Sequence, residues 1–215
     1  MAGNQCPCGG ANVFGKRQAS GQLKRYRKKG PDKTTRLLLD ALTAEGVEGL
    51  SLLDIGGGIG VIALELFKTG VTAATEVEAS PAFIPLAQAE ATQQGVSDRV
   101  AVREGDFVAL AAGIPTAGIV TLDRVICCYP DMPALVGQSA AKAAKLYGVV
   151  YPRDTWWVRA LGTLANRVLP LLRNPLRLYI HPTAAVDALI RDNGLAQRFH
   201  RDAGYWQVVV YARPV

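Results

Sequence analysis

The chain has 215 residues, of which 49% are hydrophobic and 20% are charged, so it is long enough for one domain with a sizeable core. No apolar run is long enough to cross a bilayer, and the first ten residues, MAGNQCPCGG, lack the hydrophobic stretch of a signal peptide. Four cysteines in a chain of this size do not indicate a disulfide framework. These features predict a cytoplasmic protein without a transmembrane segment.

The net charge of +6 is concentrated at the N-terminus. Residues 1–36 contain nine of the 24 lysines and arginines and one of the 18 acids, Asp32, so the rest of the chain is near neutral. We therefore predict a basic N-terminal arm over residues 1–30 and one folded domain over residues 31–215. Tyr26 lies within the basic cluster of the arm, where phosphate contacts and base stacking could hold RNA or another polyanion.

Strand and helix patterns alternate after the arm. A helix begins at Pro31-Asp32 and runs to about residue 44, and a buried strand over residues 50–54 leads through glycines into a helix over 61–68. The remaining predicted elements are strands at 71–77, 99–103, 118–128, 148–152, 195–201 and 206–212, and helices at 80–94, 132–146, 155–172 and 182–193. Repeated β–α units with a closing strand pair predict an α/β fold, a doubly wound and mostly parallel sheet with helices on both faces.

The segment LSLLDIGGGIG, residues 50–60, joins a strand to a helix through closely spaced glycines, so backbone N–H groups can approach a ligand there. The dinucleotide fingerprint G-x-G-x-x-G/A does not fit, because Val61 stands at the position of its third glycine or alanine. The spacing D-x-G-x-G-x-G, formed by Asp54, Gly56, Gly58 and Gly60, resembles motif I of the class I S-adenosylmethionine-dependent methyltransferases. This resemblance implies S-adenosylmethionine as cofactor and a seven-stranded, Rossmann-like sheet whose last strand is antiparallel.

The ends of the next two strands supply further cofactor candidates. Methyltransferases of this superfamily carry D-x-S or E-x-S after the second strand, so Glu78 matches best and Glu76 is the reserve for binding the ribose hydroxyls. A solvated acid at a helix N-terminus is the other interpretation of either glutamate. After the third strand, the resemblance implies that Asp106 accepts a hydrogen bond from the adenine amino group and that Phe107 packs on the ring.

The fourth strand ends in Asp123 and Arg124, which are costly on a hydrophobic strand unless they are paired or contact a ligand. Both interpretations remain open. In this superfamily the same edge borders the methyl group and the substrate. Residues 122–130 depart from the Asn-Pro-Pro-Tyr motif of amino-group methylating enzymes. They resemble the magnesium-protoporphyrin O-methyltransferases, although they are one residue longer and lack the histidine of that subfamily.

Methyl transfer is an in-line displacement in which positioning supplies much of the rate, and a base is needed only when the acceptor must lose a proton. The candidate bases are Asp123, Tyr129, His181 and Tyr26. Predicted substrate contacts are Tyr26, Arg124, Arg153, Trp156 and Trp157, with the arginines suited to a carboxylate or phosphate and the tryptophans to a flat apolar group.

The helix over 155–172 carries arginines among leucines. Such a helix can contact a membrane surface, but it can equally pack on the sheet as a cap, and we favour packing.

The cysteines form two close pairs, Cys6 with Cys8 and Cys127 with Cys128. If the arm folded over the fourth strand, the four thiols could bind a soft metal. Neither spacing is C-x-x-C, and adjacent residues on a strand point to opposite faces of the sheet. We therefore predict thiols without a metal.

The sequence as a whole predicts an S-adenosylmethionine-dependent methyltransferase that acts on a small molecule. Two alternatives are an RNA methyltransferase that uses the basic arm and a non-catalytic module that binds S-adenosylmethionine.

Overall fold

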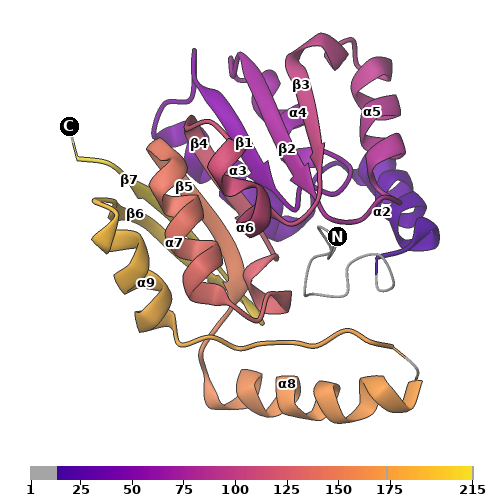
Figure 1. The fold of residues 1–215 in the computed structure, drawn as a ribbon, viewed down its shortest axis with the longest axis vertical. Helices are drawn as coiled ribbons and strands as arrows, with labels where there is room; N and C mark the ends of the chain where they lie inside the picture. The colour runs from indigo at the N-terminus through magenta and orange to yellow at the C-terminus, as the bar shows by residue number, and fades with distance from the viewer. Residues whose placement is uncertain (1–13, 173, 215) are drawn as a thin grey trace.

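The computed structural model describes residues 14–172 and 174–214, which form a central sheet with helices on both faces (Figure 1). The strands are β1 (Ser51–Ile55), β2 (Ala73–Glu78), β3 (Val100–Glu104), β4 (Ala117–Asp123), β5 (Ala143–Pro152), β6 (Ala196–Ala203) and β7 (Trp206–Ala212). Their order in the sheet is β3-β2-β1-β4-β5-β7-β6, and β7 runs antiparallel to both of its neighbours. The predicted α/β fold, with a seven-stranded sheet and an antiparallel last strand, is therefore confirmed.

Helices cover both faces of this sheet. They are α2 (Lys16–Lys29), α3 (Lys33–Ala44), α4 (Val61–Phe67), α5 (Ile84–Gln93), α6 (Phe107–Leu110), α7 (Met132–Lys142), α8 (Trp156–Val168) and α9 (Thr183–Asp192), with short 3₁₀ turns at Ser97–Arg99, Ala111–Gly113, Ile126–Cys128 and Leu169–Leu172. Because side chains alternate along a strand, Leu52 packs with α3 and α4, whereas Leu53 packs with α6, α7 and α9.

The start of α3 is set by its capping residue. One carboxylate oxygen of Asp32 accepts hydrogen bonds from the backbone N–H groups of Thr34 and Thr35, both at 3.1 Å. A capping acid of this kind satisfies backbone groups that the first turn leaves without partners. Further along the helix, Leu38 approaches the sheet so closely that the strand position beneath it is Gly148.

The helix α2 lies against the α4 and α5 side of the molecule (Figure 1). The Tyr26 hydroxyl donates a hydrogen bond to Glu65 at 2.7 Å, and the guanidinium of Arg27 pairs with the buried carboxylate of Glu90 at 2.7 Å. These contacts fix a helix that begins at Lys16, within a stretch whose sequence shows no sustained periodicity.

Three predicted boundaries are wrong. The fourth strand ends at Asp123, and Ile126–Cys128 forms a 3₁₀ turn although its residues are apolar. The alanine-rich helix ends at Lys142, because residues 143–146 pair with neighbouring strands as the start of β5. The helix predicted to begin at residue 80 begins at Ile84 as α5, and the Ser80 hydroxyl donates to the carbonyl oxygen of Phe14 at 2.6 Å.

The segment α8 and the extended chain after it lie along one end of the molecule (Figure 1). The predicted helix over 155–172 is confirmed as α8 and the 3₁₀ turn that follows, but its predicted packing on the sheet is wrong. Leu161, Leu164, Val168 and Leu172 are exposed. Within the described residues, no helix is both long enough and apolar enough to cross a membrane.

Gly148 offers a test of the packing of α3 on the sheet. A Cβ atom at this position would lie 2.7 Å from Cδ1 of Leu38, whereas one at Gly137 of α7 would meet nothing within 4 Å. We expect Gly148→Ala to lower the free energy of unfolding by about 1–3 kcal/mol through overpacking, and Gly137→Ala to raise it by about 0.5–1 kcal/mol. Urea denaturation measures both, and equal effects would contradict the close approach of α3.

Candidate functional site

A cavity of about 540 Å³ lies at the carboxyl ends of β1, β2 and β4, with α2 forming one wall. In doubly wound sheets this edge is where ligands bind. The predicted site residues that line the cavity are Tyr26, Asp54, Gly56, Gly58, Glu78, Asp106, Phe107, Asp123, Arg124 and Tyr129. Five carboxylates but only two guanidinium groups line it, so the cavity is acidic.

The glycine loop between β1 and α4 adopts backbone conformations that favour glycine. Gly56, Gly58 and Gly60 have φ values of 69°, 61° and 78°. A Cβ atom on Gly56 would lie 2.5 Å from a methyl carbon of Val125, so a side chain there would collide with the β4 edge. Gly60 does not line the cavity, because a Cβ atom there would point at the carboxylate of Glu76, only 2.6 Å away.

Asp54, the last polar residue of β1, has a carboxylate that is almost fully buried. Its Oδ1 accepts a hydrogen bond from the Thr121 hydroxyl at 2.6 Å, but its Oδ2 has no hydrogen-bond partner among the described residues. Oδ2 lies beside the loop, 2.8 Å from where a Cβ of Gly57 would be. Burial raises the pKa of Asp54 well above its ordinary value, and the charge of Glu76 adds to this. A bound cation or N–H donor would satisfy the vacant oxygen.

Two glutamates of β2 have different environments. The Glu78 carboxylate faces the cavity and accepts backbone hydrogen bonds from Gly58 at 2.9 Å and from Ser80 at 2.7 Å. Burial raises its pKa. Glu76 lies behind the loop, where burial first and Glu78 second raise its pKa to about 7. Glu78, rather than Glu76, is therefore the glutamate placed to contact a ligand.

The end of β3 also contributes to the cavity lining. Asp106 caps α6 through the backbone N–H of Val108, and its carboxylate accepts a hydrogen bond from the Tyr129 hydroxyl at 3.0 Å. Burial and this hydrogen bond raise the pKa of Tyr129. Tyr129 therefore stands at the cavity as a neutral donor, and the buried Phe107 ring lies beside it in the lining.

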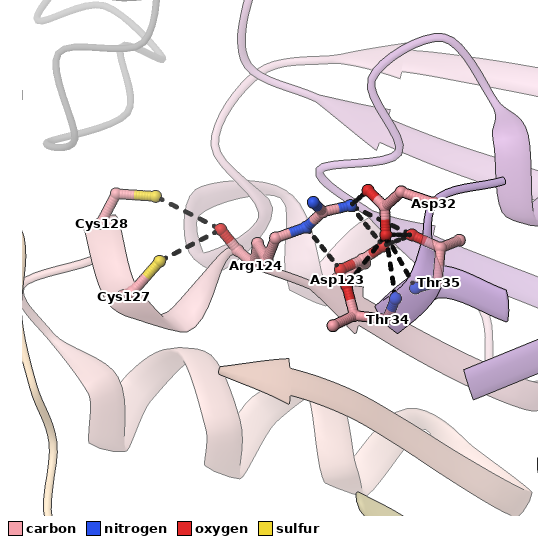
Figure 2. Close-up of polar contacts among 7 residues, drawn as sticks. All are labelled: Asp32, Thr34, Thr35, Asp123, Arg124, Cys127 and Cys128. Atoms are coloured by element: carbon pink, nitrogen blue, oxygen red, sulfur yellow. Dashed lines mark hydrogen bonds and ion pairs between the residues drawn. The ribbon is translucent and has the colours of Figure 1, made fainter. Parts of the chain in front are cut away.

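The β4 edge carries a charged network in which one guanidinium bridges two carboxylates (Figure 2). Arg124 contacts Asp32 at 2.7 Å through Nη2 and Asp123 at 2.9 Å through Nε. The Thr35 hydroxyl donates to Asp123 at 2.5 Å. Of the two open interpretations of Asp123 and Arg124, the ion pair is realised, and the same two side chains also line the cavity.

Arg124 has a φ value of 62°, the only positive value among the described residues other than glycine. Such a conformation costs on the order of 1–3 kcal/mol and persists where surrounding contacts hold it. Here the backbone N–H donates to the Val150 carbonyl at 2.8 Å while the side chain reaches Asp32. Burial opposes the ionisation of Asp32, but Arg124 and backbone hydrogen bonds lower its pKa below the ordinary value.

The two adjacent cysteines come shortly after Arg124 in the chain. Cys127 and Cys128 are buried in the 3₁₀ turn, and both thiols point toward the Arg124 carbonyl oxygen, at 3.3 and 3.7 Å (Figure 2). They therefore do not point to opposite faces, as a strand would require. Cys6 and Cys8 lie outside the described residues, within which no cluster of metal-binding side chains occurs.

Besides Gly60, four predicted residues lie outside the cavity lining. His181 contacts the Tyr129 carbonyl oxygen at 3.2 Å and stacks on Tyr179, and burial lowers its pKa. Arg153 pairs with Asp202 at 2.7 Å. Trp157 packs edge-on against Tyr205, and Trp156 is exposed.

Sequence reasoning missed several lining residues. Gln22 and Arg25 of α2 and Phe83 before α5 line the cavity, as do Asp32 and Thr35. Asp32 carried one usable signal, since it is the single acid among the first 36 residues. The others have no pattern that separates them from surface residues.

Comparisons with known proteins agree with this architecture. The family model described as methyltransferase small domain matches residues 23–120, slightly less than half of the chain. A ribosomal protein L11 methyltransferase of Deinococcus radiodurans is 33% identical over 76 residues, which cover 35% of this chain and 28% of that protein. Its counterpart in Erwinia tasmaniensis is 28% identical over 127 residues, which cover 56% and 43%. The chain thus spans less than half the length of these relatives.

Solved structures extend the likeness over nearly the whole chain. Magnesium protoporphyrin IX methyltransferase of Synechocystis PCC 6803, solved with bound SAH, superposes with a TM-score of 0.71 at 18% identity and covers 95% of this chain and 98% of that one. A chain from a complex of the Haloferax volcanii Trm112 methyltransferase activator gives a TM-score of 0.72 at 14% identity, covering 96% and 98%. At such identities the likeness shows the fold.

Glu76 leads to a prediction about stability and pH. Because its pKa is raised in the folded state, its contribution to stability is present in full below the ordinary pKa of glutamate and is lost as the pH rises through 7. The advantage of Glu76→Gln over the wild type should therefore grow by about 3 kcal/mol between pH 4 and pH 8.5. Urea denaturation across this range measures it. The exposed Glu48→Gln is the matched control, and a constant difference for Glu76→Gln would contradict the prediction.

Proposed function

We propose that this chain, which belongs to the class I S-adenosylmethionine-dependent methyltransferase superfamily, transfers a methyl group from S-adenosylmethionine to a small-molecule acceptor. The observation that carries the proposal is the buried Oδ2 of Asp54 beside the glycine loop, which has no hydrogen-bond partner in the part of the chain that the structure describes. Together with the acidic lining, it suits a ligand that carries positive charge, and S-adenosylmethionine has both an ammonium and a sulfonium group.

The lining residues fit the parts of this cofactor. We assign Asp54 and the loop from Gly56 to Gly58 to its amino-acid end, because an ammonium would complete the hydrogen bonding of Oδ2. Each Glu78 oxygen accepts one backbone hydrogen bond and has a further lone pair for a ribose hydroxyl. Asp106 and Phe107 remain the proposed contacts of the adenine ring.

The cofactor supplies an activated methyl group on a sulfonium, and the chain supplies position. Asp123 already accepts hydrogen bonds from Arg124 and Thr35, and the Tyr129 hydroxyl donates a hydrogen bond to Asp106. Neither group is therefore arranged as a strong base. We infer that the β4 edge orients the acceptor and that alignment, rather than proton abstraction by these residues, lowers the barrier.

The acceptor side of the cavity is largely apolar. Val125, Cys128, Tyr129 and Leu135 line it next to the β4 edge, so a flat or apolar molecule fits this wall. The helix α2 closes the cavity on another side, which favours a small acceptor over an extended polymer. We accordingly propose a basic N-terminal arm over residues 1–30, in which α2 covers the cavity, and a methyltransferase domain over residues 31–215, with the cytoplasm as its location.

Calorimetric titration with S-adenosylmethionine, and then with S-adenosylhomocysteine, tests the cofactor. We expect one molecule of either to bind per chain, with a Kd in about the 1 µM–1 mM range. Protein that is folded by circular dichroism but releases no heat with either compound would contradict the assignment of the cavity.

A substitution in the glycine loop locates the binding. A side chain at Gly58 would enter the cavity near Gln22, 3.2 Å from its Oε1. We expect Gly58→Val to weaken cofactor binding at least about tenfold while the protein stays folded. Gly95→Val is the matched control, because Gly95 has a φ of 71° and nothing within 4 Å of a Cβ atom, so it adds similar backbone strain away from the cavity. Equal binding losses would mean that strain, not position, is responsible.

Methyl-labelled cofactor distinguishes the acceptor classes. Label should pass to flat or apolar small molecules and not to RNA or ribosomal protein, because Arg27 is already paired with Glu90 and Arg25 faces the cavity. Transfer to RNA that falls steeply with salt would support the nucleic-acid alternative. Cofactor binding without transfer to any class would support the non-catalytic module.

A further inference from the structure

The large hydrophobic side chains that are exposed in the described residues all lie in α8 and the 3₁₀ turn after it. They are Trp156, Leu161, Leu164, Val168, Leu171 and Leu172, and we call them the α8 ridge. Trp156 and Leu171, near its two ends, are each 82% exposed. Six large apolar side chains exposed within one short segment of the chain indicate an interaction site.

The ridge is held outward by contacts on the other side of α8. Val158 and Gly162 are buried, and a Cβ atom on Gly162 would lie only 3.0 Å from Ile180 of the chain that runs back along the helix. The Asn166 side chain exchanges two hydrogen bonds, at 2.7 and 2.8 Å, with the backbone of Leu178. Hydrogen bonds and close packing thus hold α8 against the chain around residues 178–180. The ridge cannot turn inward without breaking these contacts.

The charge around the ridge has one sign. Residues 155–186 contain four arginines and no aspartate or glutamate. Arg159 is exposed and contacts Asp154, just before this stretch, at 2.5 Å, and Arg167 is exposed beside the leucines. Tryptophan and leucine on one face of a helix with arginine at its borders is the pattern of helices that lie in the interface of a bilayer.

We propose that the α8 ridge docks the protein on an anionic lipid surface. A second copy of the chain is a poorer occupant, because no other exposed patch of large hydrophobics occurs in the described residues. Copies would have to pair ridge to ridge, which would bring two arginine-rich segments together. Anionic headgroups instead complement the arginines while the leucines and Trp156 enter the acyl boundary.

Docking would also orient the cavity. The helix α8 follows the carboxyl end of β5 (Figure 1). The cavity lies at the same edge of the sheet, at the carboxyl ends of β1, β2 and β4. A bilayer under α8 would therefore lie near that edge. We infer that the methyl acceptor is an apolar molecule dissolved in the membrane, an inference that rests on the proposed methyl transfer.

Vesicle flotation tests the docking without cofactor or acceptor. The full chain should float with vesicles of phosphatidylglycerol and phosphatidylcholine, and much less with phosphatidylcholine alone. The variant Trp156→Ala/Leu164→Ala/Leu171→Ala, which changes only exposed side chains, should lower the partition coefficient about tenfold or more. Its thermal midpoint and calorimetric cofactor binding should match the wild type, so that failure of docking and failure of the proposed function remain separate.

The matched control changes charge on another exposed helix. Lys24→Ala/Lys28→Ala on α2 should reduce flotation by no more than about twofold. Three results would overturn the proposal: no flotation of the wild type, loss of flotation in the α2 variant but not in the ridge variant, or a ridge-dependent dimer in sedimentation analysis without lipid binding.

Discussion

The burial of carboxylates at the ends of β1 and β2 is the constraint on which the site depends. Asp54, Glu76 and Glu78 lie at one sheet edge, where burial raises the pKa of all three and neighbouring carboxylate charges add to this for Asp54 and Glu76. Each is accommodated differently. Glu78 accepts hydrogen bonds from backbone N–H groups, and Glu76, behind Gly60, has a pKa of about 7. Among residues 14–172 and 174–214, one oxygen of Asp54 has no hydrogen-bond partner. The glycine loop therefore serves two purposes, since Gly60 gives room to a buried glutamate while Gly58 opens the cavity.

The β4 edge also connects a helix to the sheet. Arg124 joins the capping residue of α3 to the last residue of β4, and it does so from a strained backbone conformation. Because β4 ends at Asp123 and the chain turns after Arg124, the thiols of Cys127 and Cys128 both point back toward the Arg124 carbonyl oxygen. The charged pair thus shapes the β4 wall of the cavity as well as stabilising the start of α3.

The order of strands and helices could be predicted because hydrophobic periodicity and the glycine spacing are local signals. The cofactor candidates followed from their place after successive strands, and most of them do line one cavity. The predicted ends of helices and strands are wrong where tertiary contacts, and not the local sequence, determine them. Residues 143–146 look helical by composition but pair in the sheet, and Val125 and Ile126 look like strand but follow a left-handed residue. Arg153 is wrongly placed because sequence order does not say on which side of a strand end a side chain lies. His181 is wrongly placed because it lies in the irregular segment before α9, whose position tertiary contacts decide.

The helix α8 shows a further limit of periodicity. An amphipathic pattern specifies that one face differs from the other, but not which face meets the protein. In α8 the side that meets the protein carries Val158 and Gly162, while larger residues such as Leu164 face outward. The small residue at 162 lets the returning chain approach closely and replaces the leucines as the packing surface. Because the returning chain around Ile180 packs on the inner face of α8, the leucines of the helix remain on its outer face. This apolar face lies at the end of the sheet where the cavity forms.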